Sequence, residues 1–280
     1  MALRGCLRGV LLACWVSSCL SAFGLVPEWV CAWHDGRCMA MVRWMAVLCF
    51  VTAAWADTPS AAPRCPAGMV LVPGGQFQFG PEGESAEDPY YLAGSSERVA
   101  SFCMDSREVS VGAFLTFGKP VVSADCPAQR DGRVSVSCVS FSQAAGYCAS
   151  RGGRLPSEVE WEFAARGGRS FAFPWGRVAV AFRPLVSNLC LLRQERTGSL
   201  GACVSGFSVS DRTASGIFDL GFNLSEWTSS VLLGSERRVV RGGNWTLRDV
   251  APVTTQRVAR AVDYVGSEVG FRCVGAVRAQ

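Results

Sequence analysis

The stretch Arg154-Leu155-Pro156-Ser157-Glu158-Val159-Glu160-Trp161-Glu162 decides how this chain folds. Ser157 and Glu160 stand at the Ser-x-x-Glu spacing of a capping box, in which each side chain bonds the backbone N–H of the other residue, and Pro156 lies just outside. The spacing predicts a helix that begins after Ser157 and ends where Arg166-Gly167-Gly168 offers a left-handed C-cap. On spacing alone this is a well-capped helix that carries no chemistry.

Several further blocks surround this helix in a fixed order along the chain. They are Met69 to Gly75 with Phe77, Phe79 and Gly80; Phe102 to Asp105 with Glu108-Val109-Ser110; Phe173 to Gly176; Asp219 to Trp227; Arg241 to Trp245; and Gly270 to Cys273. With the capped helix, this ordered set resembles the sulfatase-modifying factor family, whose best-known members are the formylglycine-generating enzymes. The resemblance covers Pro66 to Val274.

The resemblance implies an α+β domain with the C-type-lectin-like fold of the sulfatase-modifying factor type, loop-rich and with little regular secondary structure. The sequence itself is consistent with a loop-rich fold, because aromatic side chains cluster in short motifs and do not follow helical or strand periodicity. Val70-Leu71-Val72 and Phe77-Gln78-Phe79 alternate around Pro73-Gly74-Gly75 and predict a hairpin.

Two more helices are expected from their capping residues. Ser110 is expected to cap a helix that runs through Phe117, and Ser142 to cap one that runs through Ala149.

Residues 1–56 differ in character from the rest of the chain and are interpreted as a leader. Met41-Val42-Arg43, the apolar run from Trp44 to Ala54 and the ending Ala54-Trp55-Ala56 are typical of a secretory signal peptide over residues 41–56, with cleavage before Asp57. Residues 57–65 are expected to form a linker and residues 66–280 a single domain. The protein is therefore expected to be exported, to the periplasm, the cell envelope or the extracellular space.

The segment before the signal peptide leaves two interpretations open. The apolar run from Val10 to Val26 is interrupted by serines and makes a poor membrane span, so translation starting at Met39 or Met41 is the simplest account. The alternative is an anchored N-terminus, with Leu11-Leu12-Ala13-Cys14 as a lipid-attachment box.

Cysteine usage supports export. Of the fourteen cysteines six fall in the leader, and the remaining eight are an even number that indicates disulfides in an exported domain. The resemblance implies the pair Cys148 and Cys273. Short loops favour Cys190 with Cys203 and Cys126 with Cys138. A zinc site lacks both a Cys-x2-Cys pair and a histidine partner.

The domain lacks residues that most nucleophilic and metal-dependent mechanisms require. His34, in the leader, is the only histidine, so Ser-His and Cys-His pairs and histidine metal sites are excluded from the domain. In formylglycine-generating enzymes two cysteines after the Arg-Gly-Gly motif hold copper(I), and the resemblance places these positions at Leu247 and Pro252. The resemblance also places Phe222 and Ser225 where the family has glycine and an active-site tryptophan. No catalytic residue is assigned, and copper is not expected.

A calcium site is implied by the same resemblance. Its ligands would be the side chains of Asp219 and Glu226 and the backbone carbonyls of Phe222 and Leu224. A second family site would use Asn188 and the Leu189 carbonyl, but its acidic position corresponds to Ser205, so this site is expected to be weak or absent. Without the resemblance, Asp219 and Glu226 would be read as part of a solvated turn.

Arginines inside the motifs are interpreted as structural, because a guanidinium fork can tie loops together through bidentate pairs. The expected buried pairs join Arg154, Arg241 and Arg272 to Glu158, Glu162 or Asp105.

Charge excludes a nucleic-acid partner. Removing four basic and two acidic leader residues from the totals of 27 and 23 leaves 23 basic and 21 acidic residues. The leading hypothesis is an exported binding or scaffold domain, a pseudoenzyme that binds a peptide, a glycan or an envelope protein and meets membrane only through an N-terminal anchor. The alternatives are a formylglycine-generating-type oxidoreductase that matures sulfatases, a related periplasmic tailoring enzyme, and a tethered structural piece of the envelope.

Overall fold

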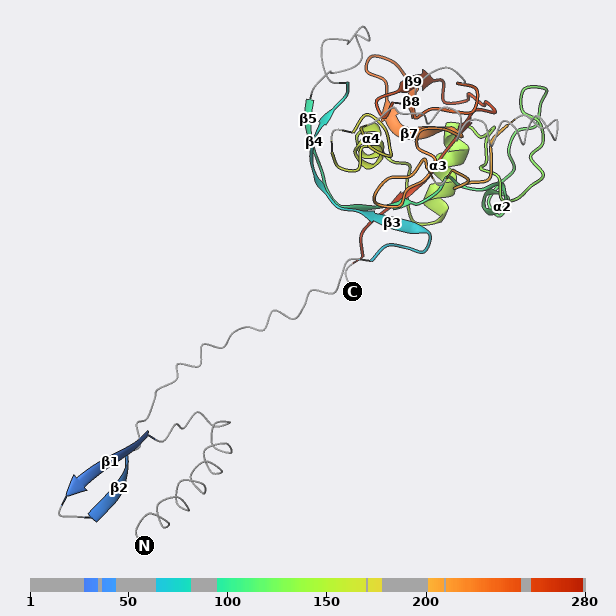
Figure 1. The fold of residues 1–280 in the computed structure, drawn as a ribbon. Helices are drawn as coiled ribbons and strands as arrows, with labels where there is room; N and C mark the ends of the chain where they lie inside the picture. Colours follow the sequence, from blue (N-terminus) through green and yellow to red (C-terminus); the bar gives the residue numbers. More distant parts are fainter. Residues whose placement is uncertain are drawn as a thin grey trace. The chain divides into compact units, whose positions relative to one another are not determined.

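The structure is a computed structural model that describes residues 28–34, 37–43, 64–81, 95–169, 171–177, 201–208, 210–247 and 253–278. The chain divides into two compact units, Met1–Ser60 and Ala61–Gln280. In the first unit β1 (Glu28–His34) and β2 (Arg37–Arg43) pair as antiparallel strands (Figure 1). The expected apolar run and cleavage site, residues 44–56, lie outside the described residues. In the described part of the chain no helix is long and apolar enough to cross a membrane.

The described residues of the second unit form short strands in three small sheets (Figure 1). The first has the order β11-β6-β3, the second pairs β4 with β5, and the third has the order β10-β7-β8-β9. The strands are β3 (Met69–Val72), β4 (Gly75–Phe79), β5 (Ser95–Val99), β6 (Phe102–Asp105), β7 (Ser225–Val231), β8 (Arg238–Arg241), β9 (Arg257–Arg260), β10 (Val269–Gly270) and β11 (Val274–Gly275).

The predicted hairpin between residues 70–72 and 77–79 is wrong. Strand β3 pairs with β6 and β4 pairs with β5, so the two segments belong to different sheets. The chain does not reverse at Gly74, because Gly74 packs against the backbone near β5: its N–H donates to Ser101 Oγ at 2.9 Å, and a Cβ there would lie 2.5 Å from the Val99 carbonyl oxygen.

Helix α4 (Glu158–Ala165) begins and ends where the sequence predicts. The Glu160 N–H donates to Ser157 Oγ at 3.1 Å and the Ser157 N–H donates to Glu160 Oε2 at 2.8 Å, which completes the capping box. Gly167 and Gly168 then adopt φ of 62° and 68°, as a left-handed C-cap requires.

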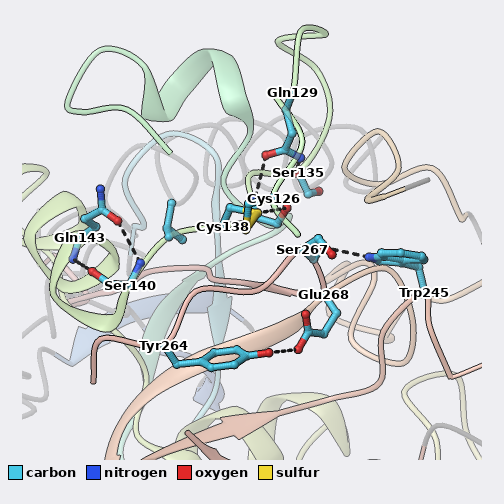
Figure 2. Close-up of a disulfide and its surroundings, with 12 residues drawn as sticks. Cys126, Gln129, Ser135, Cys138, Ser140, Gln143, Trp245, Tyr264, Ser267 and Glu268 are labelled. Carbon is cyan, nitrogen blue, oxygen red and sulfur yellow. Dashed lines mark hydrogen bonds between the residues drawn. A yellow bond between two sulfur atoms is a disulfide. The ribbon is translucent and has the colours of Figure 1, made fainter. Parts of the chain in front are cut away.

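The other two helices differ from the prediction in length or start. Helix α2 (Val111–Phe114) is capped by Ser110 but ends before Phe117. Helix α3 (Phe141–Ser150) is capped by Ser140 and not by Ser142, because Gln143 completes a capping box with Ser140 (Figure 2).

Two tryptophans with no exposed surface lie at the centre of the unit. Trp227 packs in a cluster with α3 residues and donates from Nε1 to the Val139 carbonyl at 3.0 Å. Trp161 packs in a second cluster with β3, β4 and β6 and donates from Nε1 to Glu226 Oε2 at 2.8 Å. Each indole therefore fills a core and satisfies its N–H, which is what a buried tryptophan requires.

Two fully buried ion pairs tie the loops to these cores. Arg241 bonds Glu162 of α4, and Arg272 forms a bidentate pair with Glu226 at 2.6 to 2.9 Å. The expected structural role of both arginines holds, but Glu226 was not among the partners expected for Arg272.

The remaining expected ion pairs are rearranged. Arg154 bonds Glu160 at 2.6 Å with its side chain 56% exposed, so the expectation of a buried pair for Arg154 is wrong. Asp105 and Glu158 bond Arg151 and Arg257 instead. The capping box holds the Glu160 carboxylate at the Ser157 N–H, where the Arg154 guanidinium bonds both of its oxygens.

Disulfides join segments that are between 12 and 125 residues apart in sequence. The structure contains Cys148–Cys273 and Cys126–Cys138, and also Cys65–Cys103, which was not anticipated (Figure 2 shows Cys126–Cys138). Cys203 is disulfide-bonded as well, while Cys190 lies outside the described residues.

Substitution of Glu226 by glutamine should lower the free energy of unfolding by about 3 to 5 kcal/mol, because it leaves the buried guanidinium of Arg272 without its counter-charge. Chemical denaturation of the wild type and the variant measures this. Asp131→Asn breaks the exposed pair with Arg133 and should change stability little, so it is the matched control. Equal effects of the two substitutions would contradict the assigned role of the buried pair.

Substitution of Gly242 by alanine separates steric crowding from backbone strain. Gly242 has φ of 83°, and a Cβ there would lie 2.9 Å from the Leu220 carbonyl oxygen and from a Trp161 ring carbon. Gly234 has φ of 73° but open space, so Gly234→Ala incurs backbone strain alone. We expect Gly242→Ala to cost about 1 to 3 kcal/mol more than Gly234→Ala, measured by denaturation. A Gly242 variant as stable as the Gly234 variant would refute the close packing.

Candidate functional site

A small cavity lies on one face of the sheet formed by β10, β7, β8 and β9. Its volume is about 170 Å³. The pairing of Ser225 with Val269 and of Val240 with Val258 brings residues from every strand of this sheet to the same face. Six further residues complete the lining, namely Asn244, Thr246 and Leu247 from the loop after β8, and Gln256, Arg260 and Glu268.

The loop after β8 is fixed by side-chain hydrogen bonds. Ser225 Oγ donates to the Gly242 carbonyl at 2.9 Å and accepts from Asn244 Nδ2 at 2.9 Å. Asn244 Oδ1 in turn accepts from the N–H of Thr246 at 3.0 Å and from its hydroxyl at 2.6 Å. Ser225, in the position where the resemblance places a tryptophan, thus anchors the loop.

The position implied for the first catalytic cysteine lies at this cavity, since Leu247 lines it. Pro252, at the second position, lies outside the described residues. No described residue that lines the cavity carries a thiol. The Cys273 sulfur is not free either, because it is bonded to Cys148. The described part of the site therefore offers an apolar side chain where the family chemistry needs a thiolate.

Two polar atoms that belong to lining residues are buried without a hydrogen-bond partner. They are Gln256 Oε1, an acceptor, and Arg260 Nε, a donor. Arg260 lies 3.7 Å from Glu268, which also accepts from the Tyr264 hydroxyl at 2.5 Å (Figure 2). Burial and this bond to Glu268 raise the pKa of Tyr264. Sequence reasoning missed Gln256 and Arg260, because neither belongs to a motif.

The Asp219 loop forms a second site of buried polar groups. Asp219 and Asn223 adopt φ of 60° and 70°, and Asp219 accepts from the Gly206 N–H. Asp211 accepts from the N–H groups of Gly221 and Phe222, both at 2.9 Å. Carboxylates that accept hydrogen bonds from backbone N–H groups thus fix the conformation of the loop.

Glu108 adds a third buried carboxylate to this loop, and sequence reasoning assigned it no role. It accepts from Ser135 Oγ at 2.5 Å, from the Leu224 N–H at 3.1 Å and from Asn223 Nδ2. Burial, followed by repulsion from Asp219 and Glu226, raises its pKa well above the ordinary value. The only signal for Glu108 in the sequence was that it belongs to the motif block formed by Phe102 to Asp105 and Glu108-Val109-Ser110.

The same two causes act on the neighbouring aspartates. Burial raises the pKa of Asp219 to about 6, opposed by the bond from Gly206. Burial, and after it repulsion from Asp219, raises the pKa of Asp211 to about 8. The carboxyl groups of Glu108, Asp211 and Asp219 are therefore shifted toward their protonated forms, although Arg272 lowers the pKa of each.

The expected calcium ligands can be compared with this geometry. Both oxygens of Glu226 are engaged by Arg272 and Trp161, so in this arrangement Glu226 does not fit the role of a calcium ligand. Across the described ranges no group of three or more His, Cys, Asp or Glu is placed to hold a metal ion. Asn188 lies outside the described residues, and Ser205 donates to the Glu108 carbonyl at 3.0 Å. Calcium binding stays a prediction of the resemblance.

Comparison with solved structures supports the fold. The structure of PvdO from Pseudomonas aeruginosa matches with a TM-score of 0.55 and 20% identity, over 74% of this chain and 94% of that one. The crystal structure of CarF matches with a TM-score of 0.50 and 19% identity, over 76% and 99%. At these identities the likeness shows the fold alone, and it agrees with the expected loop-rich C-type-lectin-like architecture.

Comparison with known sequences identifies the family to which the chain belongs. The chain is 36% identical over 148 residues to the inactive C-alpha-formylglycine-generating enzyme 2 of Mus musculus, covering 48% of this chain and 47% of that protein. It is 28% identical over 163 residues to the formylglycine-generating enzyme of the same species, covering 48% and 42%. The chain spans about half the length of the curated relatives it matches. Residues 56–277 match the sulfatase-modifying factor enzyme 1-like domain, and the chain therefore belongs to that family.

Proposed function

We propose that this chain is an exported binding or scaffold domain without copper-dependent oxidase activity. The observation that carries the proposal is Leu247, which lines the cavity at the position of the family's first catalytic cysteine. Copper(I) requires soft thiolate ligands, and no described lining residue of the cavity supplies one. The only lining group at that position is a hydrocarbon side chain.

Two further observations support parts of this proposal. The relatives that are 36% identical, from Mus musculus and Bos taurus, are both described as inactive. The disulfides are of the kind that persist in oxidising compartments, which favours export.

The chemistry of the cavity indicates what kind of group it would recognise. Gln256 Oε1 needs a hydrogen-bond donor and Arg260 Nε needs an acceptor, and both line the cavity. A volume of about 170 Å³ admits one small group. A ligand that inserts a neutral polar group with both functions, such as an amide or a hydroxyl of a peptide side chain, would satisfy both atoms.

The alternative is a formylglycine-generating-type oxidoreductase, or a related tailoring enzyme. It is supported by the 28% identity with an enzyme of that name. The formylglycine-generating version would require thiolates from elsewhere in the chain, although Cys148, Cys273, Cys126 and Cys138 are held in disulfides.

The decisive assay incubates the disulfide-intact protein with copper(I), oxygen and a Cys-x-Pro-x-Arg peptide and follows the peptide cysteine by mass spectrometry. We expect no formylglycine, because the described cavity has no ligand for copper(I). An active formylglycine-generating enzyme in parallel shows that the assay works. Formylglycine produced by this protein would establish the oxidoreductase alternative.

Calcium is a separate proposal for the Asp219 loop. What supports it is the cluster of buried carboxyl groups of Glu108, Asp211 and Asp219, whose raised pKa values show that their ionised forms are unfavourable and which a bound divalent cation would favour in the ionised form. If calcium binds the native state alone, the melting temperature should rise with calcium concentration and fall with a chelator. Asp219→Asn should reduce that rise, whereas substitution of the exposed Asp263 by asparagine should not. A melting temperature indifferent to calcium would refute the proposal.

A further inference from the structure

A larger groove lies elsewhere on the same unit and shares no lining residue with the cavity beneath the sheet. Its volume is about 590 Å³. The end of β6 and the turn into α2, residues 105–110, form one side, and α3 contributes Tyr147 and Arg151. Gly68, Ala113, Arg133, Val204 and Ser205 complete the lining.

Three arginines from separate segments surround this groove, namely Arg107, Arg133 and Arg151. Arg151 bonds Asp105 at 3.1 Å, and Arg133, with its side chain 72% exposed, bonds Asp131 at 2.8 Å. Arg107 forms no ion pair with any carboxylate of the described residues, although its side chain is exposed. The groove therefore carries one guanidinium whose charge is not neutralised.

Arg107 is held in place although it is exposed. Its Nη1 donates to the Ser205 carbonyl at 2.8 Å, and its guanidinium lies 5.1 Å from the centre of the Phe218 ring. It also packs against Gly206, where a Cβ would lie 2.5 Å from the guanidinium carbon. A second exposed arginine, Arg212, lies at the same distance from the Phe218 ring. Little side-chain entropy remains to be lost when a ligand bonds Arg107.

The two carboxylates that line the groove are already engaged. Asp105 is buried and accepts from Arg151 and from the Cys273 N–H. Glu108 is turned toward Ser135 and Leu224. The charge offered to a ligand is consequently that of Arg107, joined by Arg133 where a ligand carboxylate replaces its partly exposed partner Asp131.

The apolar part of the groove distinguishes between anionic ligands. Its half-buried aliphatic side chains are those of Ala113 and Val204, whereas Val109 is only 5% exposed. The single aromatic lining residue, Tyr147, is only 5% exposed and packs against Phe114, Phe117 and Phe271. It therefore offers no open ring face on which a base or a sugar could stack. Aliphatic side chains that lie among arginines are complementary to a peptide in which acidic and aliphatic side chains alternate.

We propose that this groove binds an acidic peptide segment of a partner protein, with one carboxylate of the segment bonded to Arg107, a second replacing the partly exposed Asp131 at Arg133, and its aliphatic side chains on Ala113 and Val204. Guanidinium forks bind carboxylates bidentately, and such charge-assisted bonds are the strong ones at a protein surface. The inference does not depend on whether the protein is an oxidase, because the groove and the cavity are separate.

The test uses the full protein and a fluorescein-labelled decapeptide of alternating glutamate and valine, with fluorescence anisotropy as the readout. A peptide with glutamine at every glutamate position is the control ligand. We expect binding of the acidic peptide alone, weakened by salt. Arg107→Ala should reduce affinity about tenfold, as expected for a lost charge-assisted hydrogen bond. Arg237→Ala removes an exposed arginine far along the chain in the β7–β8 turn and should leave affinity unchanged.

Further variants and ligands keep the outcome decisive. Arg133→Gln concerns a highly exposed side chain, so it tests the groove even if Arg107→Ala impairs folding, and it should also weaken binding several-fold. Equal loss in the Arg107 and Arg237 variants, or equal binding of the glutamine peptide, would overturn the proposal. So would binding of a sulfated oligosaccharide that depends on Arg107 when the acidic peptide does not bind.

Discussion

The buried pair between Arg272 and Glu226 is the contact on which the rest of the fold depends. Arg272 also donates to the carbonyls of Asp105 and Phe218, while Glu226 accepts from Trp161 of α4. Burial of two charges is costly unless every donor and acceptor is satisfied, and here each group is bonded from several directions. Two side chains thus hold one helix, two strands and the Asp219 loop in one arrangement without a large sheet.

This arrangement accounts for the unusual electrostatics of the loop. Glu108, Asp211 and Asp219 bond backbone N–H groups that no neighbouring strand could satisfy, which is why carboxylates lie where a sheet would supply carbonyls. Their raised pKa values are the cost of that role.

Local rules predicted the elements whose determinants lie within a few residues. The capping box of α4 and its glycine C-cap are of this kind, and the pair Cys148–Cys273 followed from the family resemblance. What failed was long-range: β3 pairs with β6 and not with β4, and Arg272 bonds Glu226. Gln256 and Arg260 were missed because an unpaired atom can be recognised only after its surroundings are known.

The position of the last motif has a consequence for the order of assembly. Phe271 packs in the α3 core, Arg272 supplies the central ion pair, and Cys273 closes a disulfide across 125 residues. Contacts of such sequence separation form slowly, since the intervening chain must first be brought together. During synthesis the capped helices can form early, but neither core is complete until residues 271–274 emerge. An exported chain would thus present the unpaired Cys148 and open cores to folding catalysts until its last segment has crossed the membrane.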